Sequence, residues 1–199
     1  NLSLALTLVH VISQDNRAKS IQPALGSITP EIMQRGIQST RWEGRCSWIQ
    51  YKIPGADRMV PILVDGAHNA DSANTLATYI NDVGIPDTVK VHFVISLSAS
   101  PGKSPESVLR PLISRGHRVT LMDFSTPVEG MPWVKPANKE EVRDVVNTLT
   151  DAEVGAVEQA GMEGLKEILG NVGENELVVV CGSLYLVADV YRLASSASA

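Results

Sequence analysis

Cysteines, aromatic residues and clusters of one charge are all scarce in this sequence. Its 199 residues include two cysteines, 5% aromatic residues, and 17 basic against 22 acidic side chains, for a net charge of −5. This balance excludes a nucleic-acid surface as the main function, and we expect no polyanionic partner. Cys46 and Cys181 form no C-x-x-C pair or His/Cys cluster. We therefore predict no metal site and two reduced thiols, each buried in an apolar strand-like stretch.

Long apolar runs and the common phosphate-binding and nucleophile motifs are also missing. The longest apolar candidate, residues 2–12, is interrupted by three polar residues, so we expect no membrane contact and a cytosolic location, with a mitochondrial form left open. The sequence contains no G-x-x-x-x-G-K-[ST], G-x-G-x-x-G or G-x-S-x-G pattern. Because the chain starts at Asn1 rather than Met, we interpret it as a fragment of a longer protein, and we expect it to be inactive alone.

Strand-like and helix-like patterns alternate after residue 40, which predicts an α/β fold. Before that point we predict helices at residues 2–11 and 30–38, the second capped by Thr29 and begun by Pro30, with a loop at 20–26 between them. We predict strands at 45–51, 60–64, 89–96, 117–122 and 176–181. We predict helices at 70–82, 105–114, 138–149, 161–169 and from 183 to about 193, with a turn at 54–57 and a frayed tail at 194–199.

This order favours a Rossmann-like, mostly parallel sheet with helices on both faces. The continuous apolar run at residues 176–181 is typical of a strand buried on both sides.

The stretch PILVDGAHN places polar groups directly after a predicted strand. In open α/β sheets, ligands collect at the carboxyl ends of the strands. Asp65 has the acceptors for a vicinal diol such as ribose, the small residues Gly66 and Ala67 allow a ligand to approach the backbone, and His68 would point into the same crevice. The alternative is that Asp65 caps the following helix and His68 is an ordinary loop histidine.

Two further stretches carry candidate binding groups. Arg45, in RWEGR, has the fork geometry that suits phosphate oxygens, although an ordinary surface arginine is the alternative. Ser183, in VVCGSLYL, follows the last predicted strand and begins a helix, where a hydroxyl and free amides suit a carboxylate. A plain helix cap is the alternative for Ser183.

Taken together, the three stretches resemble a known family. The order W-x-G-R, then an apolar strand ending in D-G-A-H-N, then V-x-G-S-L-Y-L-V is similar to the carboxyl-terminal domain of the folylpolyglutamate synthase and dihydrofolate synthase group of Mur ligases. The resemblance covers essentially residues 1–193. It implies that residues 1–40 are the end of a central ATPase domain and the interdomain linker helices. Residues 41–193 would then be the C-terminal ligase domain, and 194–199 a disordered tail.

The resemblance also implies a reaction and a role for each site residue. The reaction is ATP-dependent amide formation, in which a pteroate or folate carboxylate becomes an acyl phosphate and the amino group of L-glutamate displaces the phosphate. Asn1 would lie near the adenine, Arg45 would reach the phosphates and Asp65 would hold the ribose. His68 would lie close to the nucleotide and the reacting centre as the catalytic and substrate-binding histidine, and Ser183 would help bind glutamate. The Mg²⁺ ligands would belong to the missing central domain.

The resemblance leaves the exact reaction open. Eukaryotic folylpolyglutamate synthases tend to carry threonine after D-G-A-H, whereas this chain has Asn69, which favours a dihydrofolate synthase using dihydropteroate. A folylpolyglutamate synthase that extends folate, or a bifunctional enzyme, is the alternative. A non-catalytic nucleotide-binding α/β module is a further one. As partners we expect ATP, L-glutamate, the pteroate or folate substrate and the protein's own N-terminal ATPase domain, in a monomer.

Overall fold

The computed structural model describes residues 2–86, 88–100, 104–113, 118–151 and 153–196. The chain divides into two compact units, Asn1–Trp42 and Glu43–Ala199. Within the described residues, no helix is long and apolar enough to cross a membrane. The assignment of the first 40 residues to an ATPase domain and a linker stays a prediction.

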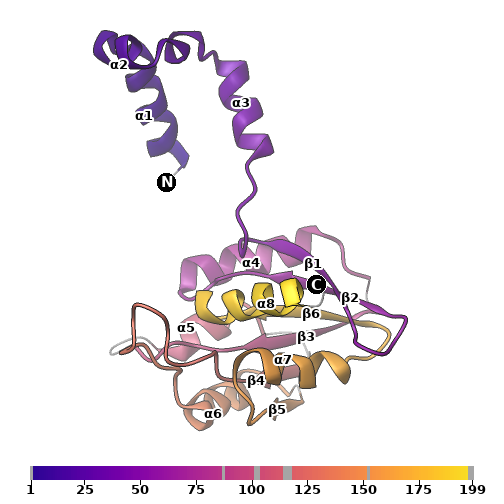
Figure 1. Ribbon diagram of the computed structural model, residues 1–199. Helices are drawn as coiled ribbons and strands as arrows, with labels where there is room; N and C mark the ends of the chain where they lie inside the picture. The colour runs from indigo at the N-terminus through magenta and orange to yellow at the C-terminus, as the bar shows by residue number, and fades with distance from the viewer. Residues whose placement is uncertain (1, 87, 101–103, 114–117, 152, 197–199) are drawn as a thin grey trace. The chain divides into compact units, whose positions relative to one another are not determined.

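Among the described residues of the first unit, every regular element is a helix. They are α1 (Leu2–Gln14), α2 (Asn16–Ile21), the 3-10 helix η1 (Pro23–Ser27) and α3 (Pro30–Ser39) (Figure 1). The start of α3 agrees with the prediction. The Thr29 side chain accepts a hydrogen bond from the Ile32 amide, and Pro30 is the first residue of the helix. The loop predicted at 20–26 is wrong in part, because α2 and η1 occupy most of it. The Asp15 side chain caps α2 by accepting a hydrogen bond from the Ala18 amide.

The second unit is a six-stranded sheet in the order β1-β2-β6-β3-β4-β5. Its strands are β1 (Ser47–Lys52), β2 (Met59–Val64), β3 (Lys90–Ile95), β4 (Arg118–Leu121), β5 (Val154–Ala156) and β6 (Glu176–Cys181). Only β1 is antiparallel to its neighbour among these strands. The predicted mostly parallel sheet is thereby confirmed, and residues 54–57 form the tip of the β1–β2 hairpin.

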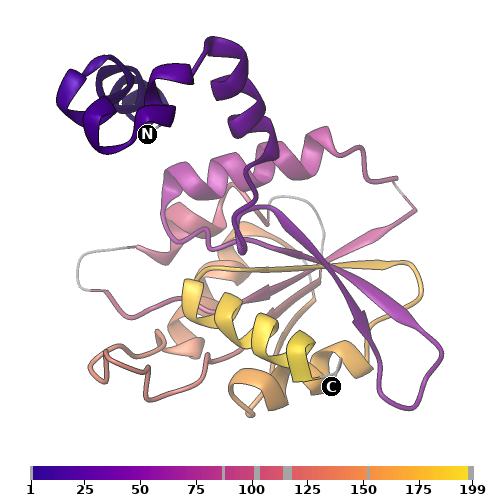
Figure 2. The ribbon, with the colours of Figure 1, turned by 45° about the horizontal axis from the view of Figure 1, so that its top comes forward.

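Helices cover both faces of this sheet, as predicted (Figures 1 and 2). One face packs against α4 (Ala70–Asp82), α5 (Pro105–Leu109) and α6 (Lys139–Leu149), and the other against α7 (Gly161–Gly170) and α8 (Leu184–Ser196). Along β6, Leu177 and Val179 join the first core while Val178 and Val180 join the second. This alternation explains why the strand reads as one continuous apolar run.

Two predicted helix ends differ from the structure. The helix α5 ends at Leu109 rather than at residue 114, and residues 110–113 continue as turns. The last helix continues to Ser196, so residues 194–196 of the predicted tail are helical. The start of the fourth predicted strand, residue 117, lies outside the described residues.

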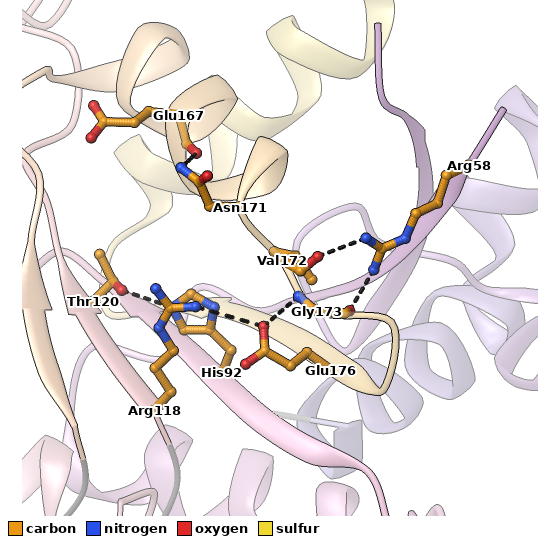
Figure 3. A network of polar contacts seen from close by, with 9 residues as sticks. All are labelled: Arg58, His92, Arg118, Thr120, Glu167, Asn171, Val172, Gly173 and Glu176. Carbon is orange, nitrogen blue, oxygen red and sulfur yellow. Dashed lines mark hydrogen bonds and ion pairs between the residues drawn. The ribbon is translucent and has the colours of Figure 1, made fainter. Parts of the chain in front are cut away.

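A polar network closes the edge of the sheet where the parallel strands begin (Figure 3). Arg58, in the β1–β2 hairpin, donates hydrogen bonds to the carbonyl oxygens of Val172 and Gly173. Glu176 accepts a hydrogen bond of 2.8 Å from the Gly173 amide and lies 3.7 Å from the Arg118 guanidinium. These contacts attach the hairpin and the loop before β6 to the strands. The candidate site lies at the opposite edge of the sheet, where the parallel strands end.

Candidate functional site

Arg45, Asp65 and Ser183 lie at the edge of the sheet where the parallel strands end. Asp65 directly follows β2, and Ser183 follows β6 after one glycine. Arg45 reaches the same edge because β1 runs antiparallel to β2, so the residues that precede β1 lie beside those that follow β2. The structure therefore places these three residues at one edge of the sheet, where Ser183 lines the pocket described below and Arg45 and Asp65 do not. Asn1 lies outside the described residues.

Asp65 is almost completely buried at this edge, with 5% of its surface exposed. Its Oδ2 accepts a hydrogen bond of 2.8 Å from the Cys46 amide, and the Cys46 sulfur lies 3.5 Å from the same oxygen. Its own amide donates to the Val180 carbonyl at 3.0 Å, which continues the β2–β6 ladder by one residue. The Cys46 amide thus orients the carboxylate, while the bond to Val180 fixes the Asp65 backbone.

Asp65 does not cap the helix that follows it, so the alternative interpretation of this residue is wrong. The cap of α4 is Asn69, whose side chain accepts a hydrogen bond of 2.9 Å from the Ser72 amide, while Ser72 completes a capping box. His68 is exposed, and its Nδ1 lies 2.8 Å from the Gly66 carbonyl oxygen. This contact fixes the orientation of the imidazole ring and leaves Nε2 on the side away from Gly66.

Gly66 allows the Arg45 side chain to pass close to the backbone. A Cβ atom at Gly66 would lie 3.0 Å from a terminal nitrogen of Arg45 and 2.3 Å from the Leu184 side chain. The Gly66 amide also donates to the Gly44 carbonyl at 2.8 Å. A larger residue at position 66 would displace both side chains, so the glycine brings a guanidinium next to the loop that carries Asp65 and His68.

Ser183 is 2% exposed and has two polar neighbours. Its Oγ accepts a hydrogen bond of 3.2 Å from the Tyr185 amide and lies 3.3 Å from the Ser98 Oγ. It therefore caps the first turn of α8, and it also lines a pocket of about 540 Å³ that His68 lines as well. The structure places His68 and Ser183 in one cavity, while their roles stay predictions.

The segment that carries Arg45 is fastened to α8. The Gly44 amide donates a hydrogen bond of 3.0 Å to the Tyr191 hydroxyl, and Gly44 has φ of 74° with Val187 packed against its Cα. Together with the bond from Gly66 to Gly44, this forms a continuous connection from α8 through Gly44 to the loop after β2. No local sequence pattern indicates this connection, because 147 positions separate Gly44 from Tyr191.

Replacing Tyr191 with phenylalanine should therefore loosen the segment that precedes β1. The Gly44 amide is partly buried and would lose its protein partner, so we expect the free energy of unfolding to fall by about 1 kcal/mol. Hydrogen exchange of the Gly44 amide should also become faster. Tyr79→Phe is the matched control, because it removes the hydroxyl that accepts the Trp48 indole bond instead. Equal exchange of Gly44 in both variants would contradict the role of Tyr191.

The two cysteines are free, but only one fits the prediction. Cys181 is completely buried at the end of β6, and burial raises the pKa of its thiol. Cys46 precedes β1 instead of lying within it, is only half-buried, and adopts a positive φ of 42°. Burial, followed by the nearby Asp65 carboxylate, raises the pKa of the Cys46 thiol to about 12. Both thiols therefore stay protonated and poorly nucleophilic at neutral pH.

No metal-binding cluster appears in the part of the chain that the structure describes: nowhere in it do three His, Cys, Asp or Glu side chains gather around one point. Ser98, which follows β3 and faces Ser183, was not among the residues predicted from the sequence. The carboxyl-end rule for parallel strands would have found it, since Ser98 stands three residues after Ile95.

Comparison with known protein families gives one match that covers most of the second unit. The family model described as dihydrofolate synthetase, C-terminal domain, matches residues 47–193. Among curated proteins, the chain is 29% identical over 193 residues to a probable dihydrofolate synthetase of Schizosaccharomyces pombe, covering 96% of this chain and 41% of that protein. It is 30% identical over 172 residues to the dihydrofolate synthetase of Saccharomyces cerevisiae, covering 85% of this chain and 39% of that protein.

Solved structures resemble the fold at lower identity. E. coli FolC in complex with DHPP and ADP matches with a TM-score of 0.64 and 18% identity, over 92% of this chain and 38% of that one. A bifunctional folylpolyglutamate synthase/dihydrofolate synthase of Yersinia pestis, complexed with AMPPNP and a Mn ion, matches with a TM-score of 0.59 and 20% identity, over 83% of this chain and 34% of that one. The chain spans about two fifths of the length of the curated relatives it matches.

Proposed function

This chain belongs to the family of the dihydrofolate synthetase C-terminal domain, and from that premise we propose that it is part of an ATP-dependent ligase joining L-glutamate to dihydropteroate. The observation that carries the proposal is the gathering of Arg45, Asp65, His68 and Ser183 at one edge of the sheet. Its relatives are dihydrofolate synthetases and folylpolyglutamate synthases, so the ligase class is common to both alternatives.

Arg45 and Asp65 would contact different parts of the bound ATP. The Arg45 guanidinium would neutralise the negative charge that spreads over the phosphate oxygens during transfer of the γ-phosphoryl group to the substrate carboxylate. The Asp65 carboxylate would accept hydrogen bonds from the ribose diol. Because the Cys46 amide and thiol occupy Oδ2, the proposal assigns the diol to Oδ1.

On the amino-acid side, Ser183 and His68 share the pocket. The helix α8 begins at Leu184, and the positive end of its dipole together with the Ser183 hydroxyl suits a carboxylate of glutamate. His68, with Nδ1 held by the Gly66 carbonyl, would direct Nε2 toward the reacting centre. The site then holds the glutamate so that its amino group meets the activated carboxylate.

The metal ligands and the main phosphate-binding loop would belong to the preceding part of a longer protein. This fits the share of the curated relatives that the chain spans. AMPPNP and a Mn ion are bound in the Yersinia pestis structure named above, and ADP in that of E. coli FolC. For this protein we propose ATP with Mg²⁺, with Arg45 and Asp65 as the contribution of this chain.

The test is an assay of the longer protein that contains this chain. ATP-dependent ligation of L-glutamate should occur with dihydropteroate and be much slower with tetrahydrofolate. The reverse preference would support a folylpolyglutamate synthase, and comparable rates would support a bifunctional enzyme. ATP binding without ligation of either substrate would identify a nucleotide-binding module and contradict the proposal.

Replacing Ser183 with alanine should raise the KM for glutamate. Loss of one hydrogen bond of about 0.5–1.5 kcal/mol corresponds to an increase of roughly 2- to 10-fold, with the KM for ATP unchanged. Thr29→Ala is the matched control, because it removes a hydroxyl that caps a helix of the first unit. An effect of Ser183→Ala on ATP alone would reassign this residue to the nucleotide.

A further inference from the structure

The pocket beside Ser183 is larger than an amino acid needs. Its volume of about 540 Å³ falls within the range of roughly 300–1,000 Å³ that is typical of sites for drug-sized ligands. Polar groups, including Ser98, Ser183 and His68, contribute to its lining. Ser100, Ser104, Asn138 and Glu141 line it as well. Five apolar residues also line it, and we define them as the apolar wall: Leu97, Val108, Met131, Val134 and Ala137.

The apolar wall is built by long-range contacts that hold it in place. The backbone of residues 135–137 is bound to the segment after β3, since the Ala99 amide donates to Lys135 and the Ala137 amide donates to Leu97, both at 2.8 Å. Met131 is tied to α8, because the Tyr185 hydroxyl lies 3.7 Å from its sulfur. The wall is therefore fixed relative to Ser183, and Met131 remains 37% exposed.

The chemistry of the proposed reaction places an apolar group next to the bound glutamate. In a pteroate, the carboxyl carbon that is activated is bonded directly to a benzene ring. The attacking amino group of glutamate must come within about 3–3.5 Å of that carbon, so the ring must lie next to the bound glutamate. In a folate acceptor, by contrast, the reacting carboxyl group ends a flexible glutamyl chain and its ring lies several bonds away.

We propose that the apolar wall binds the benzoyl ring of a pteroate substrate and that Met131 and Val134 thereby select an aryl carboxylic acid over a glutamyl chain. This inference rests on the proposed function and assigns residues of this chain to the recognition of its substrate. Burial of an aromatic ring against aliphatic side chains supplies the attraction, and the rigid attachment of the wall limits the entropy lost on binding.

The first test measures binding to the 199-residue chain by calorimetry. N-(4-aminobenzoyl)-L-glutamate contains the ring joined to glutamate, whereas N-acetyl-L-glutamate has the same amide without the ring. We expect the aminobenzoyl compound to bind about tenfold more tightly. The double variant Met131→Ser, Val134→Ser should remove this difference, whereas Val83→Ser, at an exposed position near the opposite edge of the sheet, should retain it.

Equal affinity for the two compounds in the unsubstituted chain, or an advantage that survives the double variant, would overturn the inference. Circular dichroism of each variant verifies that it is folded, and the comparison of two ligands on the unsubstituted chain is independent of the variants.

A second test separates this inference from the proposed function. In the longer protein, the double variant should raise the KM for dihydropteroate about tenfold and leave the KM values for glutamate and ATP unchanged. No ligation by the unsubstituted protein would refute the proposed function, and the binding comparison would still decide whether the wall recognises the ring. Ligation with an unaltered dihydropteroate KM in the double variant would refute the role of the wall alone.

Discussion

Asp65→Ala should lower kcat/KM for ATP by about 100-fold in the ligase proposed above, equivalent to about 3 kcal/mol. Two effects combine in this value. The substitution removes the proposed acceptor for the ribose diol, and it leaves the Cys46 amide without the carboxylate that now accepts its hydrogen bond at 2.8 Å. Since Cys46 follows Arg45, the loss should also misplace the guanidinium proposed to contact the phosphates.

Two control variants divide the expected loss between these effects. Cys46→Ala removes the thiol but keeps the backbone amide that binds Asp65, so we expect nearly unchanged kinetics with ATP. Asp65→Asn keeps an oxygen acceptor but loses the charge, so its effect should lie between those of Cys46→Ala and Asp65→Ala. A normal kcat/KM for ATP in Asp65→Ala would remove this residue from the nucleotide site, and a change confined to glutamate would contradict its assignment.

The sequence predicts an element correctly where its local pattern of caps and apolar residues matches the burial of that element in the fold. The helix predicted at 70–82 is α4, since Asn69 and Ser72 provide a capping box and Leu76 faces the core. The run from Glu176 to Cys181 is buried on both faces, and its apolar continuity expresses this directly. In such segments the local preference and the tertiary structure agree.

The incorrect helix end at residue 114 has a different physical cause. Leu112 and Ile113 are buried, so the apolar pattern continues beyond α5. The backbone, however, continues as a turn, in which the Leu112 and Ile113 amides both bond to the Leu109 carbonyl. A turn that buries the same side chains cannot be distinguished from a helix by apolar spacing. The edge strand β5 was missed because three residues carry too little periodicity.

Those residues of the candidate site that directly follow a strand could be predicted from the sequence. Asp65 and Ser183 follow apolar strands, and the rule for parallel sheets places them at one edge. The contacts that orient them come from distant segments, as in the bond between Gly44 and Tyr191. Their existence depends on how α8 packs, which no local pattern encodes.

The second large effect concerns His92 and the pH dependence of stability. His92 lies on the sheet face covered by α7, is 1% exposed, and has its Nε2 2.7 Å from the Thr120 hydroxyl (Figure 3). Its Nδ1 is buried and has no hydrogen-bond partner among the described residues. Burial, and next the positive charge of Arg118, lowers the pKa of His92 from 6.5 to about 4, although Glu176 opposes this shift.

Acidification should consequently destabilise the folded chain between pH 6.5 and pH 4. The unfolded chain takes up a proton at His92 near pH 6.5, whereas the folded chain does so only near pH 4, so each step down in this window favours the unfolded state. The stability associated with neutral His92 is complete above pH 6.5. About 3 kcal/mol of it should be lost by pH 4, as measured by urea unfolding at a series of pH values.

His92→Gln isolates this contribution from the protonation of carboxylates. Glutamine is neutral throughout this pH range and its amide can donate to the Thr120 hydroxyl, so the variant retains a polar partner without a titrating group. Carboxylates that titrate in both proteins cancel when the two pH profiles are subtracted. The difference should be flat above pH 7 and change by about 3 kcal/mol down to pH 4. Parallel profiles would mean that His92 takes up its proton equally easily in both states, which would contradict its burial beside the Arg118 guanidinium.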